Sequence, residues 1–176
     1  MHAAIEASRP GLLPWLPWAL SDNRTLEECI YNIERFRREQ EKPTCDNFVM
    51  GIFDRATGEP LGGTGFHRLK PEQQQAEVGY WIRGDRRREG ICTEAVRHLL
   101  SWGFAPQAGG GWGFRRVEIF CAAQNEASRG VPTKIGLRRE YEAKQSRWID
   151  GVGWEDTLGW GVLTHEWDRS RHAVVH

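Results

Sequence analysis

The first clear pattern along the chain is a run of apolar residues at helical spacing that begins after residue 25. Thr25 is followed three residues later by Glu28, the capping-box pattern that satisfies free N–H groups where a helix starts. The apolar positions that recur every three or four residues behind this cap are Leu26, Cys29, Ile30, Ile33 and Phe36. The pattern predicts a helix from Thr25 to Glu39.

Alternating apolar and polar residues then predict strands. Two segments, Asn47–Asp54 and Leu61–Arg68, flank the turn residues 55–58 and so predict an antiparallel hairpin. A third strand is expected over Ala76–Arg83. Apolar side chains on one face predict a helix over Thr93–Phe104, and a glycine-rich loop leads from it to a strand over Arg116–Ala122.

The remaining segment contains a proline that limits where a helix can begin. Pro132 lacks an N–H group and is tolerated in a first turn, so a short helix is expected to start near Ser128 and to end at Gly136. Two final strands, Leu137–Gln145 and Trp160–Trp167, are expected to be joined by a loop. The whole order of elements predicts one mixed α/β domain.

Composition excludes several classes of protein. The 176 residues carry 24 Lys and Arg against 24 Asp and Glu, so nucleic-acid binding through a whole-protein basic field is not expected. The four cysteines show no metal-ligand spacing, so no metal site is predicted, and such scattered thiols are typical of a reduced, cytoplasmic protein. The apolar segment Leu12–Leu20 is too short and too interrupted by prolines for a membrane span.

One loop carries the clearest chemistry. Three consecutive arginines, residues 86–88, precede Gly90, and the loop opens directly onto the helix expected from Thr93. Free N–H groups and the positive end of the dipole at a helix start bind anions, and arginines add charge-assisted hydrogen bonds. A pyrophosphate group suits such a site. A solvated, charged turn before a surface helix explains the same residues equally well.

Two separate sequence blocks resemble the GNAT acetyltransferases, in particular their RimJ/RimL branch. Arg87-x-x-Gly90-x-Cys92 is similar to the pyrophosphate loop of that family, and Gly79-Tyr-Trp81 and Thr93-Glu-Ala95 beside it are typical of the branch. Asn125-x-x-Ser128, followed by Lys134-x-Gly136-Leu137, resembles a second signature. The resemblance covers a core of about residues 12–167 within a single domain, 1–176.

The resemblance implies a fold and an activity. The fold would be a mixed, mostly antiparallel central sheet flanked by helices, with two splayed central strands. The activity would be acetyl transfer from acetyl-CoA to a primary amine by direct attack, without an acyl-enzyme. The acceptor would be a protein N-terminus or, equally, a small-molecule amine such as a polyamine, an amino acid or an antibiotic. A non-catalytic acyl-CoA-binding module is the alternative from another class, and a homodimer is a further family-level expectation.

The resemblance also assigns the acetyl-CoA contacts to three groups of residues. They are Trp81, Ile82 and Arg83 along the pantetheine; Arg87, Arg88, Glu89, Gly90, Ile91, Cys92 and Thr93 around the pyrophosphate; and Asn125, Ser128 and Lys134 across the splay.

Two residues are catalytic candidates. Glu77, at the start of a central strand, would remove the amine proton; an exposed or arginine-paired residue is the competing interpretation. The family's usual tyrosine is replaced here by Pro132, so Ser128 would protonate the leaving thiolate unless it is only a helix cap. An α-amine, with a pKa of about 8, needs much less help from a base than a lysine at about 10.4.

The chain departs from the family at three points. Arg88 and Cys92 stand where smaller residues are usual, and the start of the chain leaves little room for the strand that normally precedes the first helix, as if it were clipped there. Cys92 at a helix start is not expected to be a nucleophile, because no histidine lies near it in sequence and the family mechanism needs no covalent step.

The acceptor side is less well specified. Trp15 and Trp18 are candidate walls of the acceptor pocket, although core packing explains them almost as well. Trp148 and Trp154 fall in the loop expected before the last strand, where Glu155 and Asp156 would attract a cationic amine. His67, at the end of the second hairpin strand, could face the acceptor, but a lone histidine is more often structural or solvent-exposed.

Overall fold

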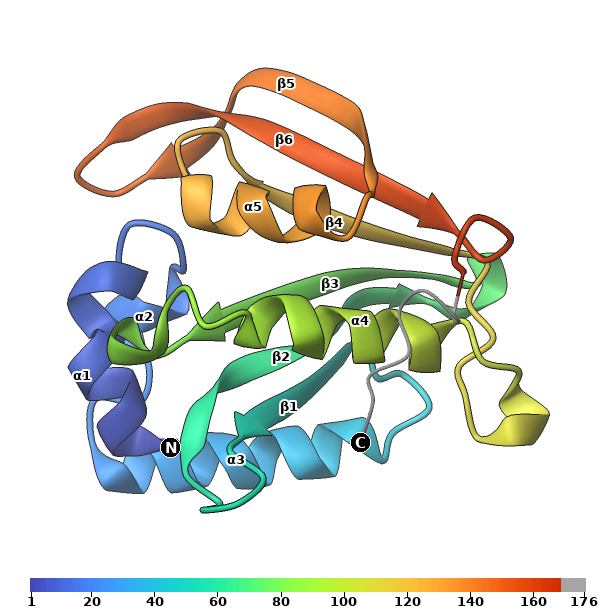
Figure 1. Ribbon diagram of the computed structural model, residues 1–176. Coiled ribbons are helices and arrows are strands. Elements are labelled where there is room, and N and C mark those ends of the chain that lie inside the picture. The colour runs from blue at the N-terminus through green and yellow to red at the C-terminus, as the bar shows by residue number, and fades with distance from the viewer. Residues whose placement is uncertain (169–176) are drawn as a thin grey trace.

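The computed structural model describes residues 1–168, and its centre is a six-stranded sheet (Figure 1). The spatial order of the strands is β1-β2-β3-β4-β6-β5. Their bounds are β1 Asn47–Phe53, β2 Pro60–Lys70, β3 Gln75–Ile82, β4 Arg116–Ala122, β5 Arg138–Ile149 and β6 Gly153–Leu163. Every pair of neighbours is antiparallel except β3 and β4. The predicted mixed, mostly antiparallel sheet is thereby confirmed.

Helices cover both faces of this sheet. Helices α4 (Ile91–Gly103) and α5 (Glu126–Lys134) pack on one face, where they form the main apolar core with side chains of the central strands. The fully buried members of this core include Phe66, Val78, Val96, Leu100, Val117 and Ile119. On the other face, α1 (His2–Leu12) contacts β2 and α3 (Leu26–Gln40) contacts β1.

The start of the chain differs from the sequence-based expectation. Residues before Thr25 form α1 and a short helix α2 (Trp18–Ser21), which the sequence did not suggest because Pro10 lies inside α1. The predicted helix after Thr25 is confirmed as α3, and the Thr25 hydroxyl accepts from the Glu28 N–H at 3.1 Å. Among residues 1–168, no helix is both long and apolar enough to cross a membrane.

The C-terminal half requires two corrections. The loop expected between the last two strands is instead the tip of a long hairpin, since β5 continues to Ile149 and β6 begins at Gly153. Helix α5 starts at Glu126 rather than near Ser128, because the Asn125 side chain caps it by accepting from the Ser128 N–H at 3.1 Å. Pro132 therefore lies inside the helix.

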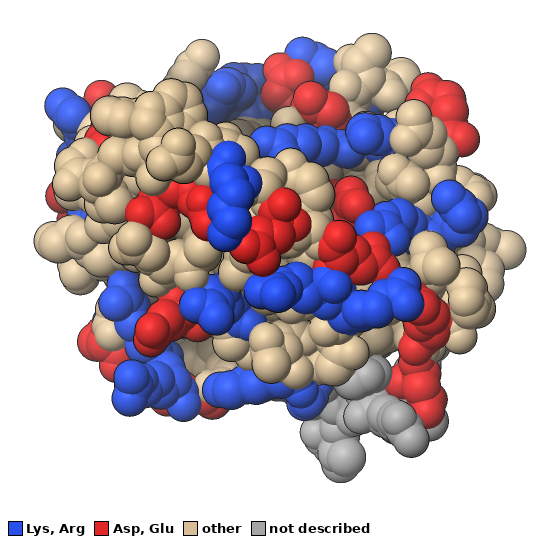
Figure 2. All heavy atoms as spheres, turned by 90° about the horizontal axis from the view of Figure 1, so that it is seen from above, with Lys and Arg blue, Asp and Glu red and all other residues tan. Residues whose placement is uncertain are grey.

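The outer side of the β5–β6 hairpin carries charges of both signs (Figure 2). Figure 2 shows basic and acidic side chains next to one another on this face, and many of them are ion-paired. Arg138 contacts Glu140 at 2.6 Å, and Lys144 contacts Asp156 at 2.9 Å. The charges on this face therefore largely offset one another locally.

Candidate active site

The two central strands separate soon after they meet. β3 and β4 pair in parallel only between Gln75–Glu77 and Arg116–Glu118, and beyond that point they diverge (Figure 1). A cleft of about 2040 Å³ opens there, lined by both strands, the N-terminal helices, the start of α4 and the start of α5. The predicted splay of the central strands is confirmed.

The edge of β3 that faces the cleft presents backbone groups. The Arg83 N–H donates to the Leu61 carbonyl on β2 at 2.8 Å. Backbone groups of an antiparallel strand alternate in direction, so Arg83 and Trp81 point toward β2 whereas Ile82 and Tyr80 point toward the gap. An extended ligand in the cleft can therefore pair with Tyr80 and Ile82.

A row of polar side chains crosses the sheet where the cleft closes. Asn47, His67, Glu77 and Glu118 are successive partners on β1, β2, β3 and β4, so their side chains share one face. We call these four residues the polar row. The Glu77 carboxylate accepts from Arg68 Nη1 at 2.6 Å, and Glu118 is paired with Arg116 at 2.8 Å. Burial nevertheless raises the pKa of Glu77 above its usual value, against the opposing effect of Arg68.

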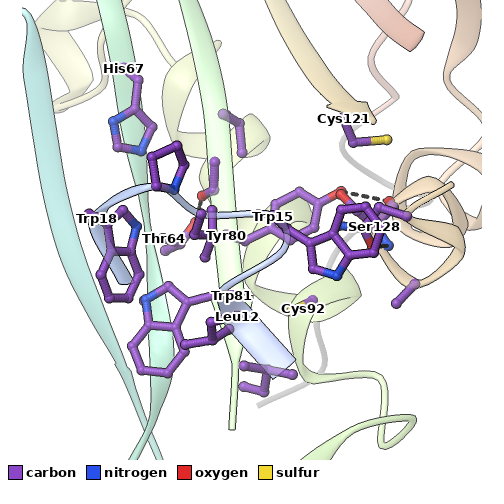
Figure 3. A pocket seen from close by; sticks show the side chains of 18 of the residues that line it. Leu12, Trp15, Trp18, Thr64, His67, Tyr80, Trp81, Cys92, Cys121 and Ser128 are labelled. Carbon is purple, nitrogen blue, oxygen red and sulfur yellow. Dashed lines mark hydrogen bonds between the residues drawn. The ribbon is translucent and has the colours of Figure 1, made fainter. Parts of the chain in front are cut away.

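Helix α5 is tied to β3 across the cleft by a tyrosine. The Tyr80 hydroxyl donates to the Ser128 carbonyl at 2.9 Å, and the Ser128 hydroxyl donates to the Tyr80 oxygen at 3.3 Å (Figure 3). In a regular helix the Ser128 carbonyl would accept from the N–H four residues later, but that residue is Pro132, which has none. Tyr80 replaces the missing donor. Asn125 is the cap of this helix, so the interpretation of Ser128 as the capping residue is wrong.

The start of α4 supplies an anion site at the mouth of the cleft. Gly90 precedes the helix with a φ of 86°, a left-handed conformation that favours glycine, and no side chain caps the helix. The N–H groups of Ile91, Cys92 and Thr93 in the first turn lack helical partners by geometry and lie beside the cleft. Arg88 also has a left-handed φ, 69°, although it is not a glycine. Together with the open edge of β3, this helix start fits a long ligand with a phosphate group at one end.

The same combination of elements is matched by a known family. Residues 2–138 match the family model described as Acetyltransferase (GNAT) domain. The chain belongs to the GNAT acetyltransferase family. The family that the sequence resemblance predicted is thereby confirmed.

Individual relatives agree with this assignment. "Putative ribosomal N-acetyltransferase YdaF" of Bacillus subtilis (strain 168) is 32% identical over 111 residues, which are 63% of this chain and 57% of YdaF. The crystal structure of a "Probable acetyltransferase" is 30% identical with a TM-score of 0.77, covering 94% of this chain and 87% of that one. RimL, a ribosomal L7/L12 α-N-protein acetyltransferase in complex with coenzyme A, resembles the fold with a TM-score of 0.79 at 20% identity, covering 92% and 85%.

The GNAT cleft brings together most, but not all, of the residues that the sequence suggested. Those that line it are Glu77, Trp81, Ile82, Arg87, Arg88, Gly90, Ile91, Cys92, Thr93, Asn125, Ser128 and Lys134. Arg83 and Glu89 are outside the lining: Arg83 is ion-paired with Asp85 at 2.7 Å, and Glu89 with Arg86 at 2.9 Å. The Arg87 guanidinium lies against Gly11 of α1, where an added methyl group would collide with it.

Cys92 is partly buried in the first turn of α4 and packs against the main core. Burial raises the pKa of its thiol to about 11. A thiol with that pKa is almost wholly protonated near neutral pH, which agrees with the expectation that Cys92 is not a nucleophile.

Aromatic side chains also line the GNAT cleft. Trp15, Trp18 and Trp148 line it, and the Trp18 and Trp81 rings meet edge to face with centroids 5.9 Å apart (Figure 3). The expectation that Glu155 and Asp156 would attract a cationic amine in the cleft was wrong. Glu155 is buried on β6 and accepts from Gln124 at 2.6 Å, and Asp156 is engaged by Lys144, so neither lines the cleft.

Two residues of the GNAT cleft were missed or undervalued from the sequence. His67 joins the polar row and lines the cleft, and Tyr80 holds Ser128. The sequence pattern predicts that His67 and Glu77 lie on two different strands. Only the observed register of β2 and β3 shows that these residues are direct partners. Among residues 1–168, no three His, Cys, Asp or Glu side chains are grouped as a metal site.

Proposed function

We propose that this GNAT enzyme transfers an acetyl group from acetyl-CoA to an α-amine, such as the N-terminus of a protein. The observation that carries the proposal is the splay of β3 and β4, which joins an unpaired strand edge to the uncapped start of α4. Acetyl-CoA has a matching shape, with an amide-containing arm at one end and a pyrophosphate at the other.

Residues on both sides of the splay would hold the donor. The backbone of Ile82 is available to the pantetheine arm, and the N–H groups behind Gly90 are available to the pyrophosphate. Arg88, before α4, and Lys134, on α5, both line the cleft and would add positive charge. Asn125 is already occupied as a helix cap, so its contribution to binding would be to hold α5 in place.

Two side chains are candidates for the proton transfers. Glu77 lies at the closed end of the cleft, and its raised pKa makes it a better base than a fully solvated carboxylate. Ser128 lines the other side of the cleft, and its hydroxyl is not used in capping. Ser128 would supply a proton to the leaving thiolate, with Tyr80 holding it in position.

The charges of the cleft favour an α-amine over a polyamine. Away from the α4 loop and from α5, the charged lining residues are Arg37, Arg68 and Arg147 with Asp22, Glu77 and Asp150. Because arginines balance carboxylates there, and Glu77 is already paired with Arg68, a multiply charged cation gains little. An α-amine carries one charge, and about a tenth of it is free base at neutral pH. The names of YdaF and RimL, which refer to ribosomal or ribosomal-protein acetylation, support the same choice.

Calorimetric titration with acetyl-CoA tests the donor site. Gly90→Asp should abolish binding, because it places a carboxylate and a strained backbone at the phosphate end. Gly58→Asp is the matched control, since Gly58 also has a left-handed φ, 72°, but lies in the β1–β2 turn outside the cleft. The proposal fails if wild-type protein does not bind acetyl-CoA, or if both variants bind equally well.

Thiol release in the presence of acetyl-CoA tests the acceptor class. Short peptides with a free N-terminus should support turnover, whereas the same peptides with a blocked N-terminus and an internal lysine should not. Spermidine is the comparison for polyamines. Faster turnover with spermidine than with every free-N-terminus peptide would contradict the acceptor assignment while leaving the donor site intact.

A further inference from the structure

Asn47 holds the ring of His67 in one tautomer. Asn47 Nδ2 donates to Asp46 Oδ1 at 2.6 Å, so the amide oxygen of Asn47 faces His67, whose Nδ1 lies 3.1 Å away. An amide oxygen only accepts hydrogen bonds, so Nδ1 of His67 must carry the proton. A neutral imidazole has one N–H, and Nε2 therefore carries a free lone pair.

The Nε2 atom lies next to the part of β3 that no longer pairs with β4. A Cβ atom on Gly79 would lie 2.9 Å from both Cδ2 and Nε2 of His67, so the ring edge rests on the bare backbone of that glycine. Gly79 follows Glu77 by two residues, which moves its position about 7 Å along β3 into the cleft. Figure 3 shows the His67 ring at the cavity, on the side where Trp18 and Thr64 lie.

The surroundings of His67 keep it neutral while Glu77 is engaged. Burial, followed by the positive charge of Arg68, lowers the pKa of His67 below its usual value, and Asp46 opposes this effect. Glu77, its cross-strand partner, faces it from β3 and accepts from Arg68 at 2.6 Å. The polar row thus contains carboxylates that are paired with arginines and one imidazole ring that lines the cleft.

We propose that His67 is a catalytic residue of acetyl transfer, and that its Nε2 takes the proton of an acceptor amine bound next to it in the cleft. The inference rests on the proposed function and adds a second base to it. The free amine attacks the thioester carbonyl carbon, and the carbonyl π pair moves onto oxygen. An N–H bond of the resulting ammonium then breaks, its proton goes to Nε2 and its electron pair stays on nitrogen. The carbonyl re-forms as the C–S bond breaks with its pair on sulfur. Sulfur takes a proton from Ser128, which regains one from solvent, and His67 releases its proton to solvent.

The dependence of kcat/KM on pH, measured with a free-N-terminus peptide, separates the two bases. For wild-type enzyme, log kcat/KM should fall with slope one below the pKa of the peptide amine, and with slope two below that of His67. His67→Gln should lose the second break and about 100-fold in kcat/KM at pH 7. Glu77→Gln should keep that break. A His67→Gln variant within twofold of wild type, or one that keeps the break while Glu77→Gln loses it, would overturn the proposal.

A second measurement needs no turnover. Long-range ¹H–¹⁵N spectra of the free protein, with His67 assigned by its loss in His67→Gln, should show Nδ1 protonated and Nε2 unprotonated at pH 7.5. Asn47→Ala should release this preference, since it removes the only acceptor that the structure places at Nδ1 within residues 1–168. A protonated Nε2 in the wild type would refute the role of His67. Absent wild-type turnover with every α-amine would instead contradict the proposed function, because acetyl-CoA binding and the tautomer are measured independently.

Discussion

The hydrogen bond between Tyr80 and the Ser128 carbonyl leads to a quantitative prediction. Tyr80→Phe keeps the shape of the ring and removes only the hydroxyl, so the Ser128 carbonyl loses its donor. A buried carbonyl left without a partner costs about 1–3 kcal/mol. Because this pair is only partly buried, we expect a loss of about 1–2 kcal/mol in the free energy of unfolding. For a chain of this length that corresponds to a fall in Tm of about 2–8 °C.

The structural reason can be tested with Pro132. The carbonyl depends on Tyr80 because residue 132 is a proline, so Pro132→Ala restores a backbone N–H at the position that normally bonds to Ser128. In a Pro132→Ala background, Tyr80→Phe should cost less than about 0.5 kcal/mol. The coupling energy between the two sites would then be about 1 kcal/mol, whatever Pro132→Ala does by itself.

Urea unfolding of the four proteins of this double-mutant cycle, analysed by linear extrapolation, measures the coupling. The m-values should agree among the four, which shows that the same surface is exposed in each case. Equal costs of Tyr80→Phe in the two backgrounds would refute the reasoning, because the Ser128 carbonyl would then not be the group that Tyr80 satisfies.

Three further predictions follow from the same structure. Arg88→Gly should raise the free energy of unfolding by up to about 1 kcal/mol, because Arg88 is held at a φ of 69° and glycine relieves that strain at some entropic cost. Urea unfolding that showed no change, or a lower free energy of unfolding, would contradict this prediction. Cys92 should react with iodoacetamide at pH 8 at least about 100-fold more slowly than a solvated thiol, because burial raises its pKa to about 11. Peptide-resolved mass spectrometry would measure this rate, and a rate like that of glutathione would contradict the prediction by showing that the site opens. Burial also raises the pKa of Tyr80 above its usual 10, so the folded state holds this proton more tightly than the unfolded state does. The free energy of unfolding should therefore fall as the pH rises past 10. Urea midpoints from pH 9 to 11 should show a smaller fall for Tyr80→Phe than for wild type.

The fold was predictable where local patterns are strong. The capping box at Thr25, the hairpin of β1 and β2, and the strand Arg116–Ala122 were all found from periodicity and turn residues. Helix α1 was not, because Pro10 breaks the helical pattern, although near the end of a helix it removes only one hydrogen bond. The β5–β6 hairpin was misjudged because strongly polar β5 shows little alternation, and only its pairing with β6 identifies it as a strand.

The segments that form the site could be predicted from the sequence, but the contacts among their side chains could not. The motif around Gly90 and the cap at Asn125 identify where the donor would bind, since both are short sequence features with a local structural cause. The ion pair of Arg86 with Glu89 uses an arginine of the loop predicted to bind phosphate, and the ion pair of Arg83 with Asp85 uses one predicted to lie along the pantetheine. Which arginine is free to bind a ligand depends on neighbours that become close only after folding.

The polar row shows how the register of the sheet decides the chemistry of the cleft. Side chains alternate along a strand, so a shift of one residue between β2 and β3 would place Val78 in the cleft and Glu77 in the core. The core prevents this, because Val78 and Phe66 are fully buried against α4 on the opposite face. Packing on one face of the sheet thereby fixes the partnership of His67 and Glu77 on the other face. A core substitution such as Val78→Ala would consequently lower the catalytic rate only if it allowed the pairing of β2 and β3 to shift.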